Sequence, residues 1–232
     1  MHLSGKKIYL TVIVAVLCLA LLAGVHALSA TADFSQSYLS GIFYRRLRNV
    51  DLTGDPRTDL VNVAMSQVGY VEGDSSSQLS GCTPGTKNYT EYARWYDRNY
   101  VPDDNFENLA WCAMFVSWCG QQADISSDVL MHHSYTVTMQ SWYEKKGLSY
   151  PRANVAAGEY TPQPGDLVFY RSSHNTNNVN HVGIVVRYED GILYAVEGNT
   201  NASPQSTNGG QVCLKSYSID DTYIRYICSP KY

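Results

Sequence analysis

Residues 108–119 read Asn-Leu-Ala-Trp-Cys-Ala-Met-Phe-Val-Ser-Trp-Cys, and this stretch decides the fold that we expect. Within it, Cys112, Phe115, Val116 and Cys119 follow the i, i+3, i+4, i+7 spacing that places side chains on one stripe of an α-helix. Asn108 can cap the helix, because its side chain can accept a hydrogen bond from a free backbone N–H group. The stretch therefore predicts a largely buried helix with Cys112 in its first turn.

The segments on either side of this helix differ in their periodicity. Helical spacing predicts further helices after Thr58 and up to Gly69, over 88–95 and over 134–146. Beyond the turn residues 162–165, the pattern changes to short β runs over 166–170, 181–188, 192–197, 211–217 and 223–228. Glu189-Asp190-Gly191 is typical of a hairpin turn. The fold class predicted is α+β, with N-terminal helices packed on a small antiparallel β-sheet.

The first thirty residues have the layout of an export signal. Two lysines, Lys6 and Lys7, precede an apolar run from residue 8 to about residue 23, and small residues follow at Ala27 and Ala30. We expect residues 1–30 to be a signal peptide or, if it is not cleaved, a membrane anchor over residues 8–28. Because the lysines would stay on the cytoplasmic side, either alternative predicts a secreted or extracytoplasmic protein. Contact with the membrane is expected only through this segment, if it is not cleaved.

The rest of the chain divides into a connecting segment and one domain. Residues 31–55 are weakly periodic and carry Arg45, Arg46 and Arg48, which indicates a linker with a solvated basic face. A catalytic domain is expected over 56–232, and the length of 232 residues suits one core. Without residues 1–30 the net charge falls from −4 to about −6, so no binding to nucleic acid is expected.

The cysteine count gives the first indication of chemistry. The chain has six cysteines, and the five outside residues 1–30 cannot all pair within one molecule. Cys213 and Cys228 are equidistant from the turn at Asp220-Asp221, so a symmetric hairpin would place them face to face and allow a disulfide. A slip of register by one residue would prevent that bond. If it forms, Cys82 and Cys119 are candidates for a second pair and Cys112 stays free.

A nucleophile with a base can be assembled from Cys112 and one histidine. A helix N-terminus favours the thiolate of Cys112, although a buried structural thiol or half of a disulfide is the alternative. His181 begins the apolar run 181–186, where its ring would be held at the edge of the core, or be only a hydrogen-bonded core histidine. The other histidines outside residues 1–30 lie in connectors or polar loops, namely His132, His133 and His174.

Glu197 and Asn199 can orient the base. They lie two residues apart, and hence on one face, at the end of the strand that the hairpin joins to His181. Gly198 between them lets another segment approach closely. The side chains of Tyr70, Trp95, Trp111 and Trp118 are candidates either for the wall of a cleft or for the core.

Four motifs in this order resemble the CHAP amidase and peptidase family. They are Trp-Cys-Ala-Met-Phe-Val-Ser-Trp at 111–118, Pro-Gly-Asp-Leu-Val-Phe at 164–169, His-Val-Gly-Ile-Val at 181–185 and Glu-Gly-Asn-Thr at 197–200. The resemblance covers roughly residues 59–232. It implies a papain-like fold, cleavage of an amide or peptide bond of bacterial peptidoglycan and a thiolate-imidazolium pair. We further expect a monomer and a reaction that requires no cofactor and no metal.

Residue by residue, the resemblance implies that Cys112 is the nucleophile, His181 the base, Glu197 the orienting acid and Asn199 an auxiliary polar group. An acyl-enzyme would form on Cys112. Some relatives bind calcium through an acidic loop, but the acidic residues 97, 103, 104 and 107 lack the spacing of a coordination loop. The choice between N-acetylmuramoyl-L-alanine amidase and peptidoglycan endopeptidase stays open.

Two other functions are compatible with the same residues. The first is an exported wall-binding or scaffold module with a non-catalytic fold, in which Cys112 pairs with Cys119 or Cys82. The second is a zinc site formed by Cys112, Cys119, His132 and His133, whose spacing resembles no usual zinc finger. A wall-cutting peptidase with a Cys, His, His order is disfavoured, because no histidine follows His181.

Overall fold

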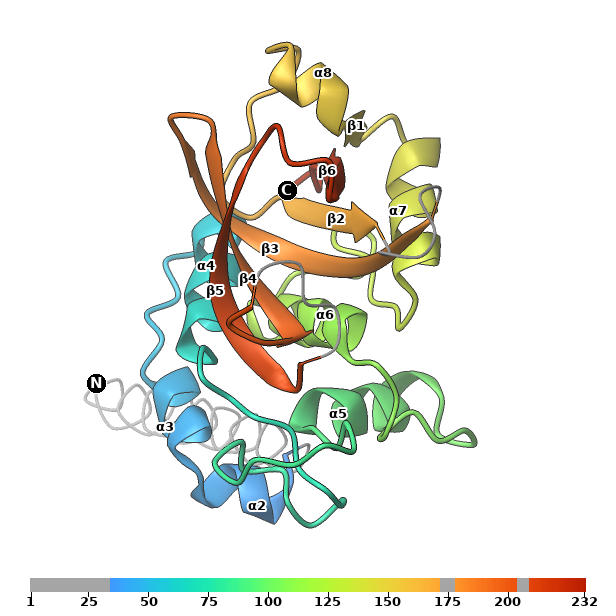
Figure 1. Cartoon of the computed structure of the whole chain (residues 1–232). Coiled ribbons are helices and arrows are strands. Elements are labelled where there is room, and N and C mark those ends of the chain that lie inside the picture. Colours follow the sequence, from blue (N-terminus) through green and yellow to red (C-terminus); the bar gives the residue numbers. More distant parts are fainter. Residues whose placement is uncertain (1–33, 172–177, 204–208) are drawn as a thin grey trace, which may run out of the picture.

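The computed structural model describes residues 34–171, 178–203 and 209–232 (Figure 1). Its centre is an antiparallel sheet of six strands in the spatial order β1-β6-β2-β3-β4-β5. The strands are β1 Ser149–Pro151, β2 Leu167–Arg171, β3 Val179–Glu189, β4 Ile192–Thr200, β5 Gln211–Ser218 and β6 Ile224–Cys228. The predicted α+β class and the antiparallel sheet are confirmed. The five expected strands are all present, and β1 is an addition to them.

Helices precede most of the sheet in the sequence. They are α2 Gln36–Ser40, α3 Ile42–Arg48, α4 Pro56–Ser66, α5 Glu91–Tyr100, α6 Cys112–Gln122, α7 Thr136–Lys145 and α8 Arg152–Ala156. Helix α6 packs against β3 and β4, and α4 and α5 pack against α6 (Figure 1). Helix α7 lies against β3 and β6. Helix α6 therefore has neighbours on several sides and forms the centre of the core.

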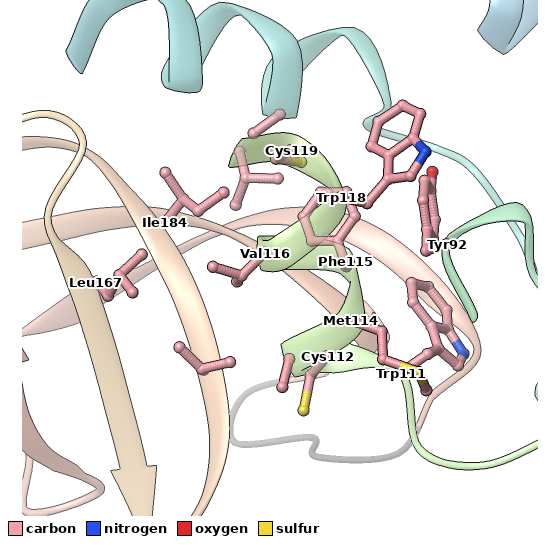
Figure 2. Packing of buried hydrophobic residues seen from close by; sticks show 14 of the residues in the cluster. Tyr92, Trp111, Cys112, Met114, Phe115, Val116, Trp118, Cys119, Leu167 and Ile184 are labelled. Atoms are coloured by element: carbon pink, nitrogen blue, oxygen red, sulfur yellow. The ribbon is translucent and has the colours of Figure 1, made fainter. Parts of the chain in front are cut away.

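The burial of α6 goes beyond the single apolar stripe that its sequence predicts. Every residue from Cys112 to Gly120 is buried. Figure 2 shows Val116 on the side of the sheet residues Leu167 and Ile184, while Trp118 lies beside Tyr92 of α5. The rings of Tyr92 and Trp118 meet edge to face with 4.9 Å between their centroids. A helix covered in this way is held rigidly, which suits a helix that positions a reactive group.

The start of α6 differs from the prediction. Trp111 occupies the N-cap position, but its side chain makes no capping hydrogen bond. The first helical hydrogen bond runs from the Phe115 N–H to the Trp111 carbonyl at 2.8 Å. Asn108 lies three residues before this cap, in an exposed turn, so it is too early to cap the helix. Cys112 is therefore the first helical residue, within the first turn as expected.

The hairpin between β3 and β4 is confirmed. Glu189 pairs with Ile192, and the two residues between them, Asp190 and Gly191, have φ angles of 50° and 75°. Positive φ at both central positions is the requirement of a type I′ turn, which aspartate followed by glycine satisfies at little cost. This turn sets the register of β3 and β4 as far as Arg187 and Tyr194, beyond which the register shifts between Arg187 and Val185.

The predicted hairpin between Cys213 and Cys228 is wrong. Strand β5 pairs with β4 at one edge of the sheet, whereas β6 lies between β1 and β2 on the other side. Cys213 consequently faces Glu197, and Cys228 faces Leu167 and Ser149. All five cysteines of the described residues are free thiols. The equal spacing of the two cysteines from Asp220-Asp221 does not indicate a hairpin, because the chain crosses from one side of the sheet to the other between β5 and β6.

The described part of the expected linker 31–55 belongs to the domain. Helices α2 and α3 fall within it, and Tyr38 and Phe43 are buried in the main core. Ser35 donates from its backbone N and its hydroxyl to the carboxylate of Glu91, at 2.9 and 2.5 Å. Burial raises the pKa of Glu91 to about 7, against the opposing effect of these hydrogen bonds. Residues 34–50 are therefore an N-terminal arm that packs on the helices.

Residues 1–33, with the expected signal peptide or anchor, lie outside the described residues. Within 34–171, 178–203 and 209–232, no helix has the length and the apolar character needed to cross a membrane.

A buried carboxylate joins the N-terminal helices to the sheet. Asp166 precedes β2 and accepts hydrogen bonds from the Gln163 N–H at 2.8 Å and the Tyr160 hydroxyl at 2.5 Å. Arg57, in the first turn of α4, donates to the same carboxylate at 2.9 Å. Asp166 is fully buried, so each of these donors compensates for part of its lost hydration. The Pro-Gly-Asp motif thus has a structural role.

We expect Asp166→Asn to lower the free energy of unfolding by about 1–3 kcal/mol, because an amide cannot accept from three donors and loses the ion pair. Urea unfolding followed by circular dichroism measures this change. Glu189→Gln is the control, since the pair of Arg187 and Glu189 is exposed with 3.7 Å between its charged groups. That variant should change stability by less than about 0.5 kcal/mol. Equal effects of the two substitutions would contradict the role of Asp166.

Candidate active site

His181 and Glu197 form a buried pair between neighbouring strands. Nε2 of His181 lies 2.9 Å from Oε2 of Glu197, and both side chains are fully buried. The two residues share a face of the sheet, because Glu197 pairs with Gly183 and Gly183 lies two residues after His181 on β3. A Cβ atom at Gly183 would lie 2.7 Å from Cγ of Glu197. The glycine therefore gives Glu197 the space to reach the ring.

Tyr170 completes the surroundings of Glu197. It pairs with His181 across β2 and β3, and its hydroxyl donates to Oε1 of Glu197 at 2.7 Å. Its ring stacks on Tyr223 and lies against Tyr217, with 4.8 and 5.1 Å between centroids. Each carboxylate oxygen thus has one partner. The sequence reasoning missed Tyr170, whose only signal was its place in the β run 166–170.

The charge state of His181 follows from its two neighbours. Burial disfavours the charged ring, but interactions with the side chains of Cys112 and Glu197 outweigh this effect and raise the pKa of His181 to about 9. The second ring nitrogen, Nδ1, is buried, and no oxygen or nitrogen of the described residues bonds to it. Nδ1 is therefore the nitrogen left for the sulfur of Cys112. The structure brings Cys112, His181 and Glu197 together in that order.

Cys112 is held in place by the residue before it. Nε1 of Trp111 donates to Oε2 of the buried Glu72 at 3.0 Å. The backbone of β4 packs directly on the same helix end, because a Cβ atom at Gly198 would lie 2.7 Å from Trp111 and 2.8 Å from Phe115. The close approach predicted at Gly198 is thus present. It brings the strand of Glu197 against the helix of Cys112.

Asn199 lies in the same region without a defined partner. It is fully buried with a φ angle of 55°, and neither polar atom of its side chain is hydrogen bonded to any described residue. Asn199 is therefore close to Glu197 in the sequence and is buried like it. No hydrogen bond joins the Asn199 side chain to the His181–Glu197 pair.

The remaining histidines stand apart from this cluster. Nδ1 of His132 lies 2.7 Å from the Tyr100 hydroxyl, and burial lowers the pKa of His132 to about 4. Burial also lowers the pKa of His133. His174 lies outside the described residues.

The zinc site considered for Cys112, Cys119, His132 and His133 is not formed. Among the residues that the structure describes, no three His, Cys, Asp or Glu side chains converge on a point that could hold a metal ion. Burial raises the pKa of the Cys119 thiol well above its usual value, which keeps that thiol neutral.

An apolar groove leads to Cys112. It has a volume of about 440 Å³, and its wall includes Phe106, Leu109, Cys112, Tyr135, Val137 and Val179. Leu109, Tyr135 and Val137 are unusually exposed for side chains of their size, at 42, 58 and 47%. The aromatic residues considered for the cleft, Tyr70, Trp95, Trp111 and Trp118, lie in the core instead. Cys112 lines this groove and is itself 4% exposed.

We expect NMR titration of the His181 ring to give a pKa near 9 in the native chain and a lower value in Glu197→Gln, because the variant removes one anion beside the ring. His132, near 4, is an internal reference. Since the pKa in the folded chain is the higher one, the charged ring contributes stability that is complete below pH 6.5 and is lost as the pH rises through about 9. A native His181 that titrates at or below pH 6.5 would contradict this electrostatic arrangement.

Comparison with known families places these residues in one domain. Residues 103–199 match the family model of the CHAP domain, and the matched segment contains Cys112, His181, Glu197 and Asn199. No curated protein and no solved structure matches the chain. Residues 103–199, which make up less than half of the chain, are therefore similar to the CHAP domain family.

Proposed function

We propose that this chain is a cysteine-dependent hydrolase that cleaves an amide or peptide bond of bacterial peptidoglycan outside the cytoplasmic membrane, acting as a monomer with a papain-like catalytic arrangement. The CHAP family supports the class of reaction, since its members are in general peptidoglycan amidases and peptidases. The observation that carries the proposal is the buried His181–Glu197 pair beside Cys112 at the start of α6.

In this mechanism Cys112 reacts as a thiolate and His181 as the conjugate acid. A pKa of about 9 keeps the ring charged at neutral pH, and the positive end of α6 favours the negative sulfur. The sulfur attacks the carbonyl carbon, and the ring proton passes to the nitrogen of the amide as the C–N bond breaks. Water then attacks the thioester, giving its proton to His181, and the free acid leaves.

The other residues act through this pair. Glu197 holds Nε2 of His181, so that Nδ1 is aimed at the sulfur and the positive ring is compensated. Free N–H groups at the start of α6 are suited to stabilise the oxyanion that forms during attack. Asn199 is proposed as an auxiliary polar group, since its buried amide still has hydrogen-bonding capacity.

We expect the purified protein to release dye from labelled cell walls, and Cys112→Ala to abolish the release because no other group can form the acyl-enzyme. Cys82→Ala is the matched control: Cys82 is an exposed free thiol and should be dispensable. In a Cys82→Ala background, a small alkylating reagent should modify Cys112 in the native state and inactivate the protein.

Full activity of Cys112→Ala would contradict the mechanism. Binding of the protein to cell walls without any release of dye would instead support the wall-binding or scaffold module.

We expect Tyr170→Phe to reduce kcat about tenfold with little change in KM, because loss of one hydrogen bond lets Glu197, and with it His181, depart from the reactive orientation. The pH profile should change as well, since the carboxylate beside His181 loses a donor. Tyr223→Phe is the control, because the Tyr223 hydroxyl is buried but not hydrogen bonded to a described residue. Equal losses in both variants would indicate that the tyrosines act only through packing.

A further inference from the structure

Three arginines line one hollow at the edge of the sheet where β1, β6 and α8 lie together (Figure 1). They are Arg152, the first residue of α8, Arg171, the last residue of β2, and Arg225 within β6. This arginine hollow has a volume of about 270 Å³, and no aspartate or glutamate of the described residues lines it. It is a local concentration of positive charge in a chain whose net charge is −4.

The sheet brings the three arginines to one place. Arg225 is an extra residue of β6, at the point where the pairing of β6 with β2 shifts register next to Tyr170. A bulge of this kind re-aims the side chain of the extra residue. Arg171 directly follows Tyr170 on β2. On its other side β6 pairs with Pro151 of β1, the residue before Arg152.

The guanidinium groups keep much of their capacity to donate hydrogen bonds. Arg171 donates to the Thr222 hydroxyl at 3.0 Å, and Arg152 donates to the Ile219 carbonyl at 3.4 Å. Nε of Arg225 is buried and has no hydrogen-bond partner among the described residues. Within that part of the chain, none of the three arginines forms an ion pair.

The carboxylates closest in sequence to the hollow do not neutralise it. Asp220 and Asp221 precede Thr222, but neither of them lines the hollow. The Asp221 carboxylate instead accepts a hydrogen bond from the Tyr223 N–H at 2.9 Å. The charge of the hollow therefore stays positive.

This arrangement is unfavourable for an empty hollow and favourable for one that holds an anion. All three arginines are half-buried, so part of the water that would screen their mutual repulsion is excluded. A buried donor without an acceptor adds a further cost. An anion would remove both costs. A phosphate monoester suits the hollow best, because it carries close to two negative charges and three oxygens that match the donors of several guanidinium groups.

We propose that the arginine hollow is a binding site for a phosphate group, either free or esterified. Nε of Arg225 donates to one phosphate oxygen, while Arg152 and Arg171 supply charge and further N–H donors. The hollow shares no lining residue with the groove beside Cys112. The inference is therefore independent of the proposed function, and its test requires no catalytic activity.

Calorimetric titration of the native chain with inorganic phosphate tests the proposal. We expect one saturable site, and at least about tenfold weaker binding of acetate, which brings one charge and two oxygens. Titration with glycerol phosphate distinguishes the two sources: tighter binding of glycerol phosphate indicates an ester as the ligand, and tighter binding of inorganic phosphate indicates the free anion. Absence of saturable phosphate binding, or equal affinity for acetate, would overturn the proposal.

Variants of single arginines locate the site. Arg225→Gln should weaken phosphate binding at least about tenfold, because a charge-assisted hydrogen bond is lost. Arg225→Lys keeps the charge without the planar fork and should have an intermediate affinity. Arg187→Gln is the matched control, since its side chain is 54% exposed and lies outside the hollow. Equal losses in Arg225→Gln and Arg187→Gln would indicate attraction by overall charge alone and would refute the site.

Thermal unfolding separates binding from a structural role of Arg225. Phosphate should raise the Tm of the native chain and of Arg187→Gln, but not that of Arg225→Gln, because only a ligand bound to the folded state stabilises it. An equal rise of Tm in all three proteins would place phosphate elsewhere and contradict the proposal. Arg152→Gln repeats the comparison if Arg225→Gln fails to fold.

Discussion

The contact between the backbone of β4 at Gly198 and the start of α6 is the constraint on which the rest of the site depends. Trp111 and Phe115 occupy the space that any side chain at position 198 would need. Glu72 holds Trp111 from another direction through its indole nitrogen. Because Cys112 follows Trp111 and Glu197 precedes Gly198, this one contact sets the separation between a thiol on a helix and a carboxylate on a strand.

A second constraint is electrostatic. A buried ion pair is tolerated only when its remaining hydrogen-bonding capacity is also satisfied, since removing two charges from water is costly. Here the two oxygens of Glu197 are divided between His181 and Tyr170. Gly183 provides the room for that division. The charged ring is therefore held by groups already present in the fold, as the proposed mechanism requires of a preorganised site.

Local patterns predicted those parts of the molecule that local forces determine. The period of α6, the alternation of the strands and the turn at Asp190-Gly191 all follow from the chemistry of neighbouring residues. The shared face of His181 and Glu197 also depends on the register shift between Val185 and Arg187. The spatial order of the strands is a property of the whole chain, so the expected facing of Cys213 and Cys228 was wrong. Tyr170 was missed for a similar reason, because its contact depends on the register between β2 and β3, which shifts directly after it.

The N-terminal arm extends the domain well beyond the segment that matches the CHAP domain model. Phe34 and Tyr38 lie against Trp118, with ring centroids 6.5 and 6.1 Å apart, and Tyr92 covers another side of the same indole. None of these three covering rings belongs to residues 103–199. A chimaera that grafts this domain into another protein therefore has to begin near Phe34. A graft that begins at residue 103 would leave Trp118 of helix α6 in water.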